Sequence, residues 1–155
     1  MLTPDLMQML NSLNDPAFCR SSRLNNVIAA LFHSDPHISW AGLYYRNPST
    51  GDYELGPFQG KPACMRIAQG KGVIGAAHYA GKALIVDDVL AFPGHIACDS
   101  ASRSELVIPL YSEGKIEAVL DLDSDVFSFF AKSSEQDLAE LQSLFEQLAF
   151  EKKRN

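Results

Sequence analysis

One cysteine in this chain lies in a setting that favours chemistry over packing. Cys98 belongs to a loop-like stretch, residues 92–99, that contains a proline and a glycine and places the thiol near His95 and Asp99. A loop thiol beside ionisable groups can be tuned toward the thiolate, the form that attacks electrophiles. The stretch therefore predicts a nucleophilic thiol, although packing as a small apolar side chain is the common alternative. His95 is a candidate to activate Cys98, or to orient the loop through a hydrogen bond.

Three acidic residues follow at positions that a hairpin would bring together. Glu105 begins one predicted strand, and Asp121 and Asp123 end its hairpin partner, so antiparallel pairing gathers the three carboxyl groups at one end of the sheet. Residues 121 and 123 share a face because side chains alternate along a strand. A solvated rim is the common alternative, but the surrounding strand is apolar, so we expect at least one carboxylate in a pocket. With Cys64 upstream, the pattern predicts thiol redox chemistry on a small cationic or zwitterionic substrate.

Hydrophobic periodicity predicts the elements that must position these residues. An apolar stripe at positions 24, 27, 28, 31 and 32 indicates a helix with Asp15 as N-cap and Pro16 in its first turn, preceded by a shorter helix at 4–10. A glycine-rich loop opens a short helix within 70–77, and a long loop covers 87–99. A capping box at 133–136 opens a final helix. Strands are expected at 38–45, 53–58, 63–67, 82–86, 105–111 and 116–123.

This order of elements predicts an α+β fold. We expect one domain over residues 1–155, with a mixed, mostly antiparallel central sheet and the N- and C-terminal helices packed on one of its faces. A chain of 155 residues is long enough to bury its own core.

Charge and hydropathy exclude two classes of partner. The formal net charge is −6, from 13 basic and 19 acidic residues, which argues against nucleic acid because phosphate binding needs a basic surface. No apolar run approaches the roughly 18 residues of a membrane span, and no signal peptide is recognisable. The expected location is therefore cytoplasmic, where the three cysteines should be mostly reduced and any disulfide transient.

Several segments together resemble one family, the GAF-type free methionine-(R)-sulfoxide reductases. The resemblance spans residues from about 40 to 130 and rests on segments 56–64, 70–73, 92–99, 104–110 and 120–124. It implies a GAF-like domain and an activity on the free amino acid, not on methionine sulfoxide within proteins. The R epimer is likewise implied by the resemblance alone.

The resemblance also assigns roles to individual residues. Cys98 matches the family's nucleophile and Cys64 its resolving cysteine, so an intramolecular disulfide is implied. The acidic residues match those that hold the substrate and assist the chemistry, with Glu105 and Asp123 on the catalytic side and Asp121 on the substrate-binding side. The aromatic wall of the pocket corresponds to Trp40 and Tyr44.

One position departs from the family pattern. Family members commonly carry a third cysteine in Gly-Val-Cys-Gly, whereas this chain has Ile74 at that place. A disulfide route through that site is absent, and a simpler recycling path through Cys64 is expected. The family implies recycling by a thioredoxin-type reductant, without a metal or organic cofactor. The oligomeric state stays open, a homodimer included.

Two other interpretations compete with the enzyme. GAF folds often bind small ligands without chemistry, so a sensor module is the main alternative. A metal site built from Cys64, His95, Cys98 and Asp99 is a weaker one, because the spacing matches no established zinc pattern. Cys19 lies outside every matching segment, on a predicted amphipathic helix, and is expected to be structural or incidental.

Overall fold

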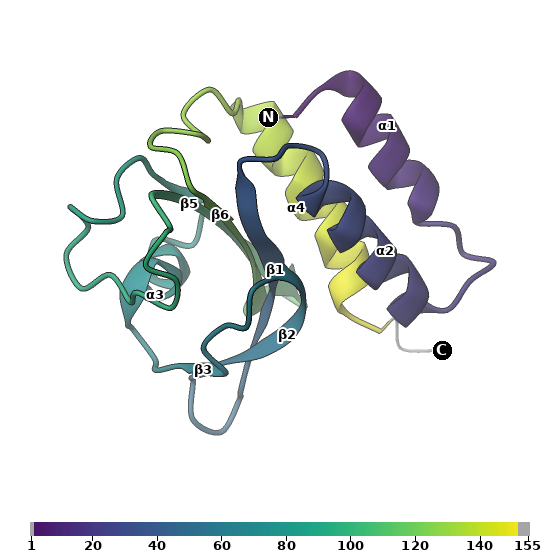
Figure 1. Ribbon diagram of the computed structural model, residues 1–155. Coiled ribbons are helices and arrows are strands. Elements are labelled where there is room, and N and C mark those ends of the chain that lie inside the picture. Colours follow the sequence, from purple (N-terminus) through teal and green to yellow (C-terminus); the bar gives the residue numbers. More distant parts are fainter. Residues whose placement is uncertain (1, 152–155) are drawn as a thin grey trace.

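A six-stranded antiparallel sheet organises the computed structural model, which describes residues 2–151 (Figure 1). The strands lie in the order β3-β2-β1-β6-β5-β4. Every pairing between them is antiparallel, which confirms the expected mostly antiparallel sheet. The bounds are β1 Ile38–Arg46, β2 Tyr53–Gly60, β3 Arg66–Ile67, β4 Leu84–Val86, β5 Ser104–Ser112 and β6 Lys115–Ser124.

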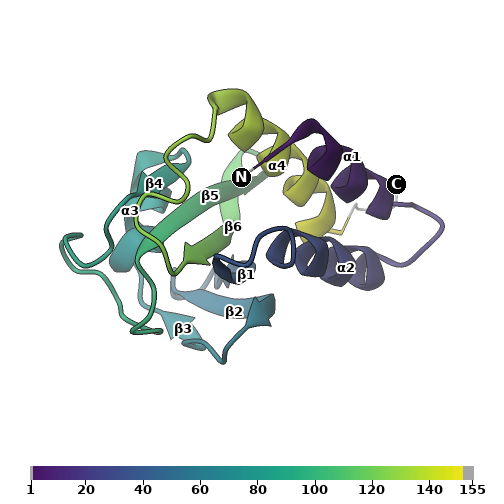
Figure 2. The same ribbon diagram turned by 45° about the horizontal axis from the view of Figure 1, so that its top comes forward.

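The helices divide between the two faces of the sheet. The terminal helices α1 (Pro4–Leu13), α2 (Arg20–Phe32) and α4 (Glu135–Ala149) lie on one face, as expected from the sequence, and α3 (Gly72–Ala80) lies on the opposite side (Figures 1 and 2). None of the helices in the described part of the chain combines the length and apolar character needed to cross a membrane.

Strand alternation splits the core into two clusters and decides where the acidic residues point. On β5 and β6, Leu106 and Leu122 pack with the terminal helices, whereas Val107 and Val119 pack in the second cluster with residues of α3. Glu105, Asp121 and Asp123 have the same odd parity as these two valines, so they belong to the α3 face. The terminal helices thus supply the larger core, and the opposite face is left for a pocket.

The start of α2 differs from the sequence-based prediction. The helix begins at Arg20, with Cys19 as its N-cap, and not behind Asp15 and Pro16. The Asp15 side chain accepts a hydrogen bond from the Ala17 amide at 2.9 Å, which closes a local turn over residues 15–18. Asp commonly makes such turns two residues ahead, and this competes with its N-cap role. Cys19 is therefore an exposed cap residue, not part of an amphipathic helix.

Two other boundaries differ from the sequence-based prediction. The capping box expected at 133–136 lies one residue later. The capping box of α4 uses Ser134 as N-cap with Asp137 as its reciprocal partner. The strand expected at 63–67 shrinks to two paired residues, Arg66 and Ile67, opposite β2. The segment before it, which includes Pro62 and Cys64, is irregular, in keeping with the missing amide hydrogen of proline. Cys64 therefore lies just outside the sheet.

Candidate functional site

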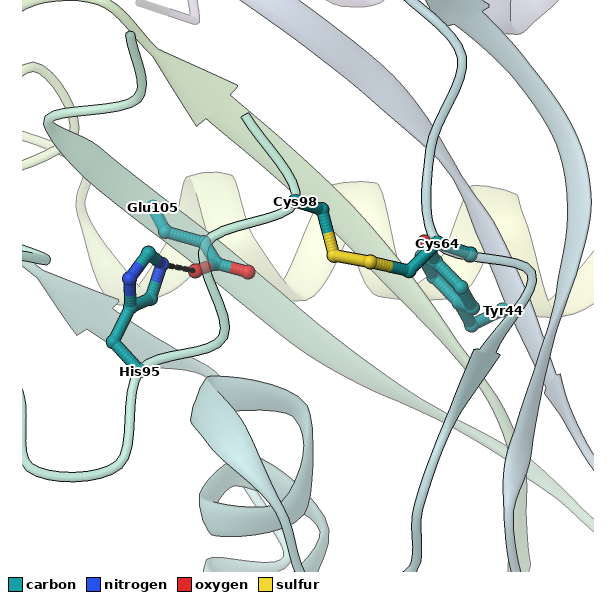
Figure 3. The surroundings of a disulfide bond; sticks show 5 residues. All are labelled: Tyr44, Cys64, His95, Cys98 and Glu105. Atoms are coloured by element: carbon teal, nitrogen blue, oxygen red, sulfur yellow. Dashed lines mark hydrogen bonds and ion pairs between the residues drawn. A yellow bond between two sulfur atoms is a disulfide. The ribbon is translucent and has the colours of Figure 1, made fainter. Parts of the chain in front are cut away.

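A disulfide closes one side of the candidate site. Cys98, in the long irregular segment between β4 and β5, is bonded to Cys64, in the segment between β2 and β3, with a Cα–Cα distance of 5.7 Å (Figure 3). Cys98 is exposed and Cys64 is half-buried. The Tyr44 hydroxyl donates a hydrogen bond of 2.8 Å to the Cys64 carbonyl and fixes that backbone against β1. The structure thus joins the two cysteines that the resemblance pairs.

The three acidic residues meet as strand pairing predicts. Glu105 lies opposite Asp123 in the β5–β6 register, and Asp121 pairs two residues further along, opposite Val107. One oxygen from each carboxyl group lies within 4.8 Å of the others. Glu105 and Asp121 are only 6% and 5% exposed. A solvated rim is therefore excluded for these two side chains.

Burial raises the proton affinity of this cluster. It raises the pKa of Glu105 well above the ordinary value, and the nearby Asp121 and Asp123 carboxylates raise it further. Burial also raises the pKa of Asp121 to about 6 and that of Asp123 well above its usual range. The Ser102 hydroxyl donates to Asp123 Oδ1 at 3.1 Å and partly opposes the shift. Such a cluster retains at least one proton near neutral pH and can act as a general acid.

Aromatic side chains form the wall beside the carboxyl groups. The Trp40 ring stacks on Tyr44 and on Phe58, with ring centroids 5.7 and 5.3 Å apart. Two buried polar atoms here have no hydrogen-bond partner within the described chain, the indole Nε1 of Trp40 and Oδ1 of Asp121. One is a donor and the other an acceptor, and each would be satisfied by a polar ligand in the pocket.

The disulfide, the carboxyl groups and the aromatic wall line one common pocket. All seven residues expected at the site meet there or beside it: Trp40, Tyr44, Cys98, Glu105, Asp121 and Asp123 line the pocket, and Cys64 is bonded to Cys98 at its edge. Ile74, at the position of the family's third cysteine, is 4% exposed and also lines the pocket. An apolar side chain thus occupies the place where the resemblance implies a thiol.

His95 has a more definite position than the sequence could give it. Its Nε2 lies 3.8 Å from Glu105 Oε2, and its ring points at that carboxyl group (Figure 3). Burial lowers the pKa of His95, so the ring is neutral at pH 7. The structure therefore favours contact between His95 and the acidic cluster.

The pocket also contains residues that sequence reasoning missed. Ser102 contacts Asp123, and Lys61 at the rim lies 4.0 Å from Asp99 through its Nζ and Oδ2. Neither residue belongs to a periodic pattern that could have identified it. Their only signal was proximity in sequence to the two cysteines.

The geometry bears on the metal site that was considered from the sequence. In the set considered from sequence, the sulfurs of Cys64 and Cys98 are bonded to each other, so neither can serve as a thiolate ligand in this oxidation state. The group that could hold a cation is the carboxyl trio Glu105, Asp121 and Asp123. Its raised pKa values favour protons, which suits acid catalysis.

Comparisons with known proteins agree with this geometry. The GAF domain family matches residues 22–151. Free methionine-R-sulfoxide reductase of Escherichia coli (strain K12) is 42% identical over 144 residues, which cover 93% of this chain and 86% of that protein. The X-ray structure of free methionine-R-sulfoxide reductase from Neisseria meningitidis in complex with its substrate is similar, with a TM-score of 0.77, 38% identity and coverage of 92% and 83%. The reduced form of fRMsr of Staphylococcus aureus gives a TM-score of 0.80 at 33% identity, over 97% and 100% of the two chains.

Proposed function

Because this chain belongs to the GAF domain family, and within it to the free methionine-R-sulfoxide reductases, we propose that it reduces free L-methionine-(R)-sulfoxide to methionine. The observation that carries this proposal is the Cys64–Cys98 disulfide at the edge of a pocket that contains three buried or half-buried carboxyl groups. The thiol pair supplies the two electrons for the reduction. The carboxyl cluster supplies the acid and binds the α-ammonium group of the substrate.

In the first step, Cys98 is the attacking thiolate. Its sulfur attacks the sulfoxide sulfur, while a protonated carboxyl group of the cluster gives its proton to the sulfoxide oxygen. The S–O bond of the substrate breaks, the oxygen is transferred to Cys98 as a sulfenic acid, and methionine leaves. The strongly raised pKa values of Glu105 and Asp123 support these two residues as proton donors.

Selection of the free amino acid follows from the third carboxyl group. Asp121 has a buried oxygen without a hydrogen-bond partner in the described chain, which suits the α-ammonium group of the substrate. A methionine sulfoxide residue within a peptide has no such charge. Trp40 and Tyr44 would provide the apolar wall for the S-methyl end.

In the second step, Cys64 regenerates the enzyme. The Cys64 thiol releases its proton, and the thiolate attacks the sulfur of the Cys98 sulfenic acid. The S–S bond forms as the S–O bond breaks, and the hydroxyl takes up the released proton and leaves as water. A thioredoxin-type dithiol of the cytoplasm then reduces the disulfide and is itself oxidised. We include no metal or organic cofactor, and dimerisation is left to measurement. Cys98 is an exposed residue, which supports recycling by an external thiol.

The decisive experiment compares three substrates with thioredoxin recycling: free methionine-R-sulfoxide, its S epimer and a peptide containing methionine sulfoxide. We expect turnover with the free R form alone and none in Cys98→Ser. Equal rates on the peptide would contradict the assignment of Asp121, and full activity in Cys98→Ser would remove the nucleophile. A non-catalytic sensor would lose no thiols when methionine sulfoxide is added, so a thiol titration tests that alternative.

A further inference from the structure

Two segments that must approach each other during the proposed reaction are joined by an ion pair in addition to the disulfide. Lys61 lies three residues before Cys64, and Asp99 follows Cys98 directly. Lys61 Nζ lies 4.0 Å from Asp99 Oδ2, so the pair connects the same two segments as the S–S bond. Neither group is a thiol, so the ion pair can also form when the two cysteines are reduced.

The Asp99 carboxylate is oriented by hydrogen bonds that do not involve Lys61. Its Oδ1 accepts the Ala101 amide at 2.9 Å, and its backbone carbonyl accepts the Ser102 amide at 3.2 Å. These bonds fold residues 99–102 into a local turn and leave Oδ2 for Lys61. The Asp99 side chain is 28% exposed, so its charge is partly shielded from water, whereas the Lys61 side chain is 74% exposed. Lys61 is thus the exposed partner of a carboxylate that is held by hydrogen bonds.

The backbone hydrogen bonds near Cys98 do not tie it to the Cys64 segment. His95 donates to the Phe92 carbonyl and Cys98 to the Ile96 carbonyl, both within the same loop. Because both bonds lie within the loop, they would not by themselves hold it near Cys64 after the disulfide is reduced. The ion pair spans that gap.

We propose that Lys61 and Asp99 form an ionic clasp that holds Cys64 near Cys98 in the reduced enzyme and so favours disulfide formation. This inference rests on the proposed function for its place in the cycle. Lys61 and Asp99 are positioning residues: they act by raising the effective concentration of the Cys64 thiol at the Cys98 sulfenic acid. By linkage, the clasp favours the disulfide by the same factor as the disulfide favours the clasp. An exposed ion pair predicts a modest factor of about threefold that is screened by salt.

The first test does not require catalysis. The protein is equilibrated with reduced and oxidised glutathione, and the ratio of Cys64–Cys98 disulfide to dithiol is measured at low and high salt. We expect Lys61→Ala to lower the ratio about threefold at low salt, 0.5 M NaCl to lower the wild-type ratio equally, and Lys61→Arg to retain it. Lys115→Ala is the matched control, since this exposed lysine begins β6 at the opposite end of the strand from Asp123. Equal low-salt ratios for wild type and Lys61→Ala would overturn the clasp.

The second test follows the sulfenic acid itself. Reduced protein receives one equivalent of free methionine-R-sulfoxide with a fixed amount of dimedone, and the fraction of chains carrying dimedone on Cys98 is measured by mass spectrometry. We expect about a threefold larger labelled fraction per methionine formed in Lys61→Ala. An unchanged fraction with normal methionine yield contradicts the clasp alone, whereas absence of methionine from the wild type contradicts the proposed function. Lys61 is the better site to change, because Asp99 also raises the pKa of Asp123.

Discussion

Glu105 on β5 lies directly opposite Asp123 on β6, so the hairpin places two carboxyl groups side by side in the lining of one pocket. Two ionised carboxylates at this separation would repel each other in a poorly hydrated site. The cluster avoids that cost by keeping protons, as the raised pKa values of both residues indicate. The register of β5 and β6 thus brings the carboxyl groups together, and the cluster can donate a proton near neutral pH.

Substitution of Glu105 by glutamine tests this acid. Glu105→Gln keeps the size of the side chain and removes its ionisable proton, so we expect methionine formation to fall about a hundredfold. The wild-type rate should decrease as pH rises through the raised pKa of Glu105, since only the protonated form donates. The variant should lack this decrease, as measured by initial rates across pH. Glu140→Gln, at an exposed site on α4, is the control, and an unchanged rate in Glu105→Gln would exclude the role.

Asp121 gives a prediction about stability. Its pKa rises from the ordinary value of 3.8 to about 6 in the folded protein, so between these values the unfolded chain loses its proton first. The contribution of Asp121 to the free energy of unfolding should therefore fall by about 3 kcal/mol as pH rises from about 4 to 6, and level off above. Asp121→Asn should reduce this slope. Urea unfolding of the oxidised wild type and variant at pH 4 and 7 measures this pH dependence. The same change in the free energy of unfolding in both proteins would contradict the raised pKa of Asp121.

The acidic cluster was predictable from the sequence because strands have a simple period. Side chains two residues apart share a face, and a short hairpin turn fixes which residues stand opposite each other. Glu105, Asp121 and Asp123 could thus be placed together without a structure. The partnership of Cys64 and Cys98 came only from the resemblance to a family, since 34 residues separate them and no period links them.

The remaining features depend on local choices that periodicity does not encode. Asp15 could cap a helix or close a turn, and in the structure its side chain closes a turn. From the sequence, His95 could activate Cys98 or orient its loop, and neither alternative anticipated the 3.8 Å approach of its Nε2 to Glu105 Oε2. The contact of Lys61 with Asp99 was also not predictable from periodicity, because it joins two irregular segments.

The hydroxyl of Tyr44 predicts an effect on the Cys64 segment. Tyr44→Phe removes its hydrogen bond to the Cys64 carbonyl, which should lower the free energy of unfolding by about 1 kcal/mol and slow disulfide formation. The methionine released in the first turnover should not change. Tyr111→Phe is a matched control, because its hydroxyl donates to the Gly81 carbonyl at the same 2.8 Å, outside the pocket. If both variants form the disulfide at the wild-type rate, the Tyr44 hydrogen bond does not position Cys64.

Oxidation should stabilise the fold. The disulfide closes a loop between residues separated by 34 positions. It lowers the conformational entropy of the unfolded chain, which raises the free energy of unfolding by about 4 kcal/mol. We expect the oxidised protein to unfold at a higher urea concentration than the reduced protein, and the difference to vanish in Cys64→Ser. Cys19→Ser should keep the full difference, because Cys19 is a free cysteine. Equal midpoints for oxidised and reduced wild type would show that the loop is equally restricted in both unfolded states.

Replacement of Cys64 separates the two halves of the proposed cycle. In Cys64→Ser the Cys98 thiol remains, so we expect about one methionine per chain in the first turnover. The sulfenic acid then has no internal thiol to attack it, because Ile74 occupies the position of the family's third cysteine and Cys19 is the N-cap of α2 on the other face of the sheet. Turnover with thioredoxin should therefore stop after that first methionine, as counted by rapid quench and amino-acid analysis. Undiminished cycling in this variant would mean that the external dithiol reduces Cys98 directly, and that the disulfide is not an obligatory intermediate.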